Sequence, residues 1–166
     1  DSQFTYNLQP LLFEQVTSGT GGAVAHDSTN RCATISLTAS SVNAHSYMLS
    51  YEHIRYQPSK SQLVFISFNF IEHVTGCRKF VGIGVLLNNS FQFRQHPDGL
   101  LSFSLLSNTT TGDVEAYQSG WNLDKLDGTG VSGITLNVFK INILAIDIQA
   151  LYAGRVRFGF DIGGTI

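Results

Sequence analysis

Oxygen-bearing side chains gather in the stretch WNLDKLDGTG, which spans residues 121–130. Asn122, Asp124 and Asp127 each carry an oxygen atom of the kind that Ca²⁺ prefers as a ligand. Their spacing is not that of a helix–loop–helix calcium site, and only the two aspartates carry charge. The same residues suit a helix N-cap or a turn, where short polar side chains accept backbone N–H groups. We therefore regard the three as weak calcium candidates that have an equally good structural role.

The glycine-rich stretch GTGVSG, residues 128–133, matches the dinucleotide fingerprint G-x-G-x-x-G. That fingerprint requires a strand before it and a helix after it, because the helix N-terminus holds the pyrophosphate. Here the polar segment NLDKLD precedes the glycines and the β-prone segment ITLNVFKINILAI follows them. We interpret the stretch as a loop and expect no cofactor.

Nucleophiles and their partners are scattered along the chain. None of the five histidines is paired with a serine or cysteine in a recognised motif, and GVSGI lacks the second glycine of the nucleophile elbow. Cys32 and Cys77 lie far apart, without a C-x-x-C pair or a histidine at zinc-ligand spacing, so we expect buried free thiols rather than a disulfide or a metal site. No catalytic residue is predicted. An enzyme remains a third hypothesis, which would require a deep pocket with convergent titratable groups.

Two arginines, Arg155 and Arg157, stand two residues apart in the run ILAIDIQALYAGRVRFGFDIGG and therefore share one face of a strand. A three-residue loop over residues 152–154 would place Leu151 opposite Arg155 and Gln149 opposite Arg157. The apolar residues of both strands then form one face, and the polar face consists of Asp147, Gln149, Arg155 and Arg157. We interpret this polar face as a wet sheet surface or as a contact with a neighbouring subunit.

The elements that must position these residues are nearly all strands. Alternating or continuous apolar runs between turn residues predict strands over 11–16, 32–37, 46–51, 62–71, 79–87, 90–96, 100–106, 113–118, 141–151 and 154–162. NLDKLD has room for one helical turn at most. Short strands with regular turns predict one all-β domain over residues 1–166, an antiparallel β-sandwich of jelly-roll type.

The hairpin FQFRQHPDGLLSFSL can be predicted to its register. Pro97 presets the first turn position and Gly99 suits a left-handed third position, which pairs His96 with Leu100. This pairing sets Phe93 opposite Phe103 and Phe91 opposite Leu105. The polar face of the hairpin then holds Gln92, Arg94, Ser102 and Ser104.

The overall composition restricts the partners of the protein. Charged residues make up 13% of the chain and the net charge is −2, which argues against non-specific nucleic-acid binding. No apolar run reaches the roughly 18 residues of a membrane-spanning helix, and no targeting segment is visible. Because the chain begins with Asp1 rather than Met, we expect a processed protein or a piece of a longer one. Leu63 and Phe65 point away from Val64 and its apolar neighbours, so a second sheet or a partner must cover one of the two faces.

Three stretches carry a resemblance to a known family: RYQPSKSQLVF, WNLDKLDGTGVSGITL and FKINILAIDIQALYAGRVRFGFDIGG. They resemble segments of a family of virion structural proteins from tailed bacteriophages and large DNA viruses, whose members carry YQPGKSQ, WNLDKLDGTGPSG and GVGRVRFGF. Ser59 stands where the family has Gly, and Val131 where it has Pro. The resemblance implies a non-enzymatic β-rich module of the virion. We expect it to be capsid- or fibre-associated and to assemble with identical subunits, first of all as a trimer, and with other virion proteins.

The alternative is a carbohydrate- or receptor-binding β-sandwich, which would serve host attachment on a virus fibre or act as a secreted module. It predicts exposed aromatic residues beside Asn, Asp or Arg at one end of the sandwich, and a glycan as partner. The aromatic residues available for such a platform are Tyr47, Tyr51, Tyr56, Tyr117, Trp121 and Tyr152. Aromatic residues in a β-sandwich more often fill the core.

Overall fold

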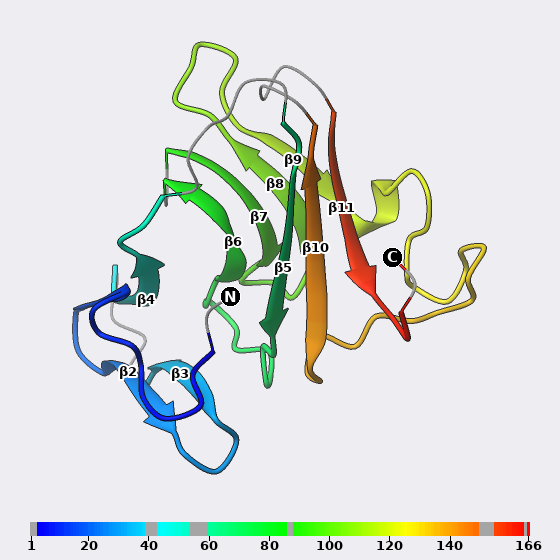
Figure 1. Cartoon of the computed structure of the whole chain (residues 1–166). Coiled ribbons are helices and arrows are strands. Elements are labelled where there is room, and N and C mark those ends of the chain that lie inside the picture. The colour runs from blue at the N-terminus through cyan, green and yellow to red at the C-terminus, as the bar shows by residue number, and fades with distance from the viewer. Residues whose placement is uncertain (1–2, 39–42, 54–59, 86–87, 150–154, 165) are drawn as a thin grey trace. The chain divides into compact units, whose positions relative to one another are not determined.

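The computed structural model describes residues 3–38, 43–53, 60–85, 88–149, 155–164 and 166, and these residues form an all-β protein with antiparallel sheets. The chain divides into two compact units, Asp1–Arg55 and Tyr56–Ile166 (Figure 1). The prediction of a single domain over residues 1–166 stays a prediction, and each unit is described by itself below. No helix among the described residues is long and apolar enough to cross a membrane.

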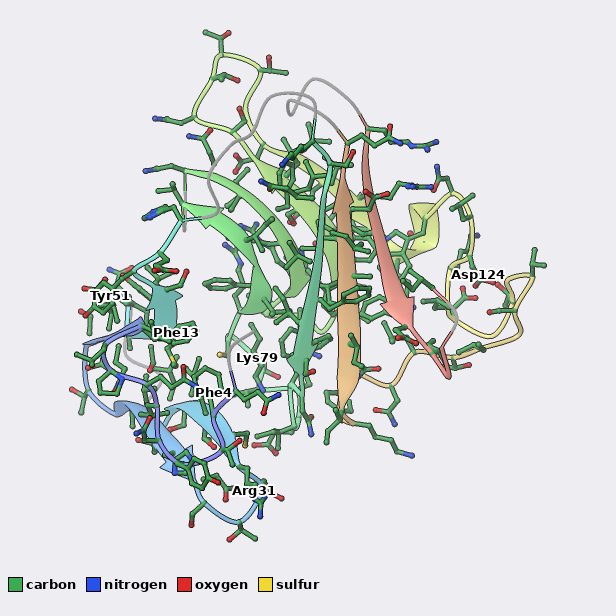
Figure 2. The ribbon with its side chains drawn as sticks, in the orientation of Figure 1. Phe4, Phe13, Arg31, Tyr51, Lys79 and Asp124 are labelled. Atoms are coloured by element: carbon green, nitrogen blue, oxygen red, sulfur yellow. The ribbon has the colours of Figure 1, made fainter. Side chains whose placement is uncertain are left out.

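The first unit consists of two antiparallel strand pairs. Strand β1 (Phe13–Ser18) pairs with β4 (His45–Ser50), and β2 (Gly22–Asp27) pairs with β3 (Cys32–Leu37). The rings of Phe4 and Phe13, labelled in Figure 2, pack with their centroids 5.2 Å apart. Strand β2 was not predicted, because Gly22 at its start and Asp27 at its end are residue types that are common in turns.

The second unit is a β-sandwich. Its first sheet has the order β11 (Val156–Asp161), β10 (Asn142–Ile148), β5 (Gln62–Phe68). Its second sheet follows the chain as a meander of β6 (Lys79–Val85), β7 (Asn89–Gln95), β8 (Leu101–Leu106) and β9 (Val114–Tyr117). A single 3₁₀ turn, η1 (Gln118–Gly120), follows β9. The segment NLDKLD, for which the sequence allowed one helical turn at most, has bends and loops.

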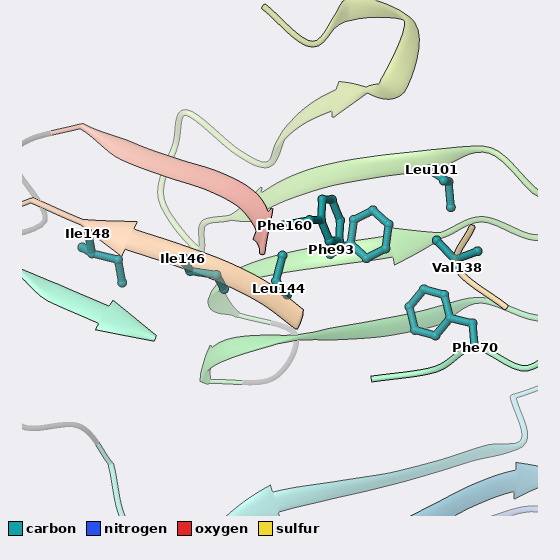
Figure 3. Packing of buried hydrophobic residues seen from close by; sticks show 8 residues of the cluster. All are labelled: Phe70, Phe93, Leu101, Val138, Leu144, Ile146, Ile148 and Phe160. Atoms are coloured by element: carbon teal, nitrogen blue, oxygen red, sulfur yellow. The ribbon is translucent and has the colours of Figure 1, made fainter. Parts of the chain in front are cut away.

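The core lies between these two sheets and combines aliphatic side chains with phenylalanine rings from both of them (Figure 3). Phe93 of β7 has no exposed surface, and its ring meets that of Phe160 of β11 edge-on, with the ring centroids 5.1 Å apart. The ring of Phe103 of β8 stacks on that of Phe158 of β11, with the centroids 4.5 Å apart. Burying each such side chain contributes roughly 1.5–3 kcal/mol, so these contacts between sheets hold the sandwich together.

The β7–β8 hairpin has the predicted register. Phe93 lies opposite Phe103 and Phe91 opposite Leu105. The backbone N–H of His96 donates to the carbonyl of Leu100 at 2.8 Å. Gly99 has a φ of +90°, a conformation that glycine adopts without the strain a side chain would bring.

The β10–β11 hairpin has a different register from the predicted one. Asp147, rather than Gln149, lies opposite Arg157, and Ile148 lies opposite Val156. This is a shift of two residues, so the division into apolar and polar faces is as predicted while the individual partners are wrong. The predicted loop at 152–154 lies outside the described residues.

Strand order in the second sheet follows the chain, and the described pairings do not establish a jelly roll.

Both cysteines are free, as predicted, but neither is buried: Cys32 is exposed and Cys77 is partly exposed. Cys32 is the first residue of β3 in the first unit, where no described residue is fully buried, so there is no core to enclose its thiol.

Candidate functional site

Polar side chains on the outer face of the β6–β9 sheet converge on Glu115 of β9. Oε1 of Glu115 accepts hydrogen bonds from the hydroxyls of Ser104 at 2.7 Å and Ser102 at 3.2 Å, and from Nη1 of Arg94 at 3.3 Å. Oε2 accepts from the hydroxyl of Tyr117 at 3.2 Å. We call this set, completed by His96, the Glu115 cluster.

Most members of the Glu115 cluster are withdrawn from water. Ser102 and Ser104 have almost no exposed surface, and Arg94 is 7% exposed. Burial opposes the charge of Glu115, yet the hydrogen bond from Ser104, the His96 ring and the hydroxyls of Tyr117 and Ser102 together hold the pKa of Glu115 below its usual value. The carboxylate is therefore ionised at neutral pH and balances the buried guanidinium of Arg94.

The Glu115 cluster contains serine, histidine and glutamate but does not have the geometry of a catalytic triad. Nε2 of His96 lies 2.9 Å from the Ser102 hydroxyl and 3.3 Å from Oε1 of Glu115. A triad requires the acid on the other ring nitrogen, where it orients the imidazole as a base. Ser102 is also fully buried, so no substrate carbonyl can reach its hydroxyl. The cluster is an organising network rather than a nucleophile site.

The Glu115 cluster fixes the orientation of one partly exposed aromatic residue, Tyr117. Its hydroxyl is held by Glu115 and its ring lies against His96, with centroids 5.2 Å apart. The charge of Glu115 raises the pKa of Tyr117, so the phenol stays protonated and keeps donating. Tyr117 thus presents a fixed aromatic surface at the end of β9.

Two hollows lie near the β7–β8 turn, and Tyr117 lines the first of them. The first, the Tyr117 hollow, has a volume of about 460 Å³ and is lined by Gly99, Leu100, Leu101, Tyr117, Gln118, Ser119 and Asp127. The second, the Gln95 hollow, has a volume of about 350 Å³ and is lined by Gln95, Gly99, Leu101, Thr135, Leu136, Asn137, Val138 and Phe139. The hollows share Gly99 and Leu101, so they adjoin each other at the β7–β8 turn.

The calcium candidates organise a loop. Asp124, labelled in Figure 2, accepts the backbone N–H of Ser132 at 2.7 Å and that of Leu126 at 2.8 Å, and these hydrogen bonds lower its pKa. Asp127 accepts hydrogen bonds from the hydroxyl and the backbone N–H of Thr129, and these likewise lower the pKa of Asp127. Asn122 is exposed in the same loop. Among the described residues, no three histidine, cysteine or acidic side chains form a group that could hold a metal ion.

The predicted polar face of β10 and β11 holds one ion pair. Nε of Arg157 donates to Oδ2 of Asp147 at 2.9 Å, and a second guanidinium nitrogen contacts the same oxygen. Gln149 meets Arg155 through the backbone, where its N–H donates to the Arg155 carbonyl at 3.1 Å. Arg155 is exposed. The arrangement is a surface pair on a sheet.

Sequence reasoning missed the Glu115 cluster as a unit. The hairpin register correctly placed Gln92, Arg94, Ser102 and Ser104 on one face. The alternation in the β9 segment DVEAYQ would have added Glu115 and Tyr117 to a common face, but only the β8–β9 pairing brings Glu115 opposite Ser104.

Compared with protein-family models, with curated proteins and with solved structures, the chain matches none.

Proposed function

We propose that the chain is a virion structural protein, a capsid- or fibre-associated β-sandwich that acts by assembling with identical subunits and with other virion proteins. The family resemblance of the three sequence stretches supports this role. The structural observation that supports it is an apolar surface on β5. The proposal gives the protein no enzymatic activity, and no role for nucleic acid or membrane.

Strand β5 carries large apolar residues on the face that points away from the core. Leu63 is 57% exposed and Phe65 is 50% exposed, while Val64 and Ile66, which alternate with them along the strand, are partly buried. We call Leu63 and Phe65 the outer β5 face. Exposed apolar residues of this size on one strand mark interaction surfaces, because leaving them in water forgoes about 25 cal/mol for each Å² that burial would remove.

The position of β5 in its sheet strengthens this proposal. Among the described strands, β5 is hydrogen-bonded to β10 alone and forms one edge of its sheet. Its sequence QLVFISF contains no charge and no proline, which are the devices that keep an edge strand from pairing with other chains. An unprotected apolar edge is a liability in a free monomer and an asset in a subunit that is covered in its assembly.

The jelly-roll type of sandwich belongs to the same proposal. It rests on the family resemblance and on the frequency of jelly rolls among viral capsid domains. An experimental structure of the assembled protein tests it, since a jelly roll requires two interlocked Greek keys.

The test of assembly is the mass of the protein in solution, measured by light scattering over a range of concentrations. We expect a closed oligomer, first of all a trimer, that Phe65→Lys converts to monomer because a charge on the outer β5 face opposes burial. Val131→Lys is the matched control, since Val131 is 98% exposed and lies in a loop. A monomeric wild type at every concentration, or a Phe65→Lys variant with the wild-type mass, would contradict the proposal.

A further inference from the structure

A buried hydrogen-bond acceptor without a partner lies beneath the Gln95 hollow. Gln95 is the last residue of β7 and is 2% exposed. Its Oε1 atom is inaccessible and is the one buried side-chain oxygen or nitrogen among the described residues that accepts or donates no hydrogen bond. Such atoms are rare because desolvation without a new hydrogen bond is costly, and each one needs an explanation.

The lining of the two adjoining hollows indicates what kind of donor would satisfy this oxygen. None of the described residues that line them is Lys, Arg or His, and the negative charge of Asp127 opposes an anionic ligand such as a phosphate. Asp127 supplies an acceptor, as Gln95 does. A ligand that suits this lining is uncharged and rich in hydroxyl donors.

Aromatic surfaces complete the pattern. Phe139 lines the Gln95 hollow and is 43% exposed, and Tyr117 lines the Tyr117 hollow and is 41% exposed. The Glu115 cluster holds the Tyr117 ring in a fixed orientation. Rings that are exposed and oriented offer a platform on which the C–H face of a sugar can pack, while its hydroxyls reach neighbouring polar atoms.

We propose that the two hollows form one binding site for a neutral oligosaccharide. One sugar occupies the Gln95 hollow, packs on Phe139 and donates a hydroxyl hydrogen to Oε1 of Gln95 after a small rotation of the amide. The next sugar packs on Tyr117 and donates to Asp127. Recognition is by hydrogen bonds and ring contacts, without a metal ion. The site is separate from the outer β5 face, so its existence does not depend on the proposed assembly.

The test uses the whole protein and four defined probes: cellotetraose, maltotetraose, chitotetraose and mannotetraose. Binding is measured by isothermal titration, and thermal unfolding is followed in parallel. We expect one or more of these probes to bind in the millimolar range or tighter, and Gln95→Leu to weaken that binding about tenfold or more, since a hydrogen bond and its orientation are lost. We also expect Gln95→Leu to unfold at a higher temperature than the wild type, because it removes a buried acceptor that has no partner in the free protein.

A second pair of variants separates recognition from folding. Tyr117→Ala should weaken binding of the same probe at least fivefold, and Tyr51→Ala, which removes an exposed tyrosine of the first unit, should leave binding unchanged. Failure of all four probes to bind the wild type at 10 mM, which corresponds to a binding free energy weaker than roughly 3 kcal/mol, would overturn the proposal. Retention of wild-type affinity in Gln95→Leu would overturn it as well. A lowered unfolding temperature of Gln95→Leu without any sugar binding would also overturn it, because the Gln95 amide would then be hydrogen-bonded to a structural water. None of these results bears on the oligomer mass, so the assembly proposal is tested separately.

Discussion

Replacing Glu115 by Gln removes one negative charge from the Glu115 cluster and leaves the side-chain volume almost unchanged. The amide oxygen can still accept from Ser102 and Ser104, whose hydroxyls lie 3.2 and 2.7 Å from Oε1. What is lost is the counter-charge of Arg94, which is 7% exposed and whose Nη1 lies 3.3 Å from that oxygen. Hydrogen bonds to charged groups contribute about 1.5–3 kcal/mol to stability. Because the Glu115 side chain is itself 28% exposed and partly screened, we expect a loss of about 2 kcal/mol in the free energy of unfolding.

The assay is urea unfolding followed by tryptophan fluorescence. Trp121 is the one tryptophan of the chain, and it stacks on Phe103 at 4.5 Å, so its emission reports on the sandwich of the second unit. A loss of about 2 kcal/mol corresponds to about 4–8 °C in the melting temperature for a protein of this size. Glu14→Gln, at an exposed glutamate of β1, is the matched control and should leave the transition in place.

The pH dependence gives a second and independent test of the Glu115 cluster. The folded-state pKa of Glu115 lies below its ordinary value of 4.5, so the folded protein binds this proton less readily than the unfolded chain does. The stabilisation is therefore fully present above pH 4.5 and is lost as the pH falls through the folded-state pKa. Wild type and Glu115→Gln should differ at pH 7 and converge toward pH 3. Equal stability at pH 7, or a difference that is as large at pH 3 as at pH 7, would refute the charge argument.

Two further substitutions address the residues that the sequence singled out. Arg157→Ala should lower the free energy of unfolding in urea by only about 0.2–1 kcal/mol, because its ion pair with Asp147 is half-exposed. This loss should be smaller in 1 M NaCl, which screens the charges. A loss above about 2 kcal/mol would show that the pair is more than a surface contact. Asp124→Ala should lower the melting temperature, since it removes the acceptor of the backbone N–H groups of Leu126 and Ser132. Thermal unfolding should also show that added CaCl₂ does not move the wild-type transition; a calcium-dependent rise in melting temperature that Asp124→Ala abolishes would instead establish a calcium site.

Local chemistry determined much of this protein. The apolar alternation of β7 and β8, with Pro97 and Gly99 between them, was enough to predict both strands and the pairing of Phe93 with Phe103, because a short turn couples neighbouring residues directly. The two faces of β10 and β11 followed from the same period of two. The partner of Arg157 did not, because a shift of two residues leaves both faces intact and the pattern cannot distinguish the two registers. Strand β2 escaped prediction because its short apolar run lies between glycines and an aspartate, which are also the residues of turns.

Only the tertiary structure decided which polar groups are buried and what they meet. Glu115 reaches Arg94 because β9 pairs with β8 and β8 with β7, and sequence spacing does not report those pairings. Leu63 and Phe65 share the outer β5 face beside β10, a neighbour from a distant part of the chain, and sequence spacing does not report that pairing. Gln95 is typical of a solvated strand end in the sequence, yet the loop over residues 135–139 joins it in lining one hollow while its Oε1 remains without a partner. Burial is a property of the assembled sheets, so the residues alone fix which side chains share a face, and packing across the sandwich fixes which of them lose water.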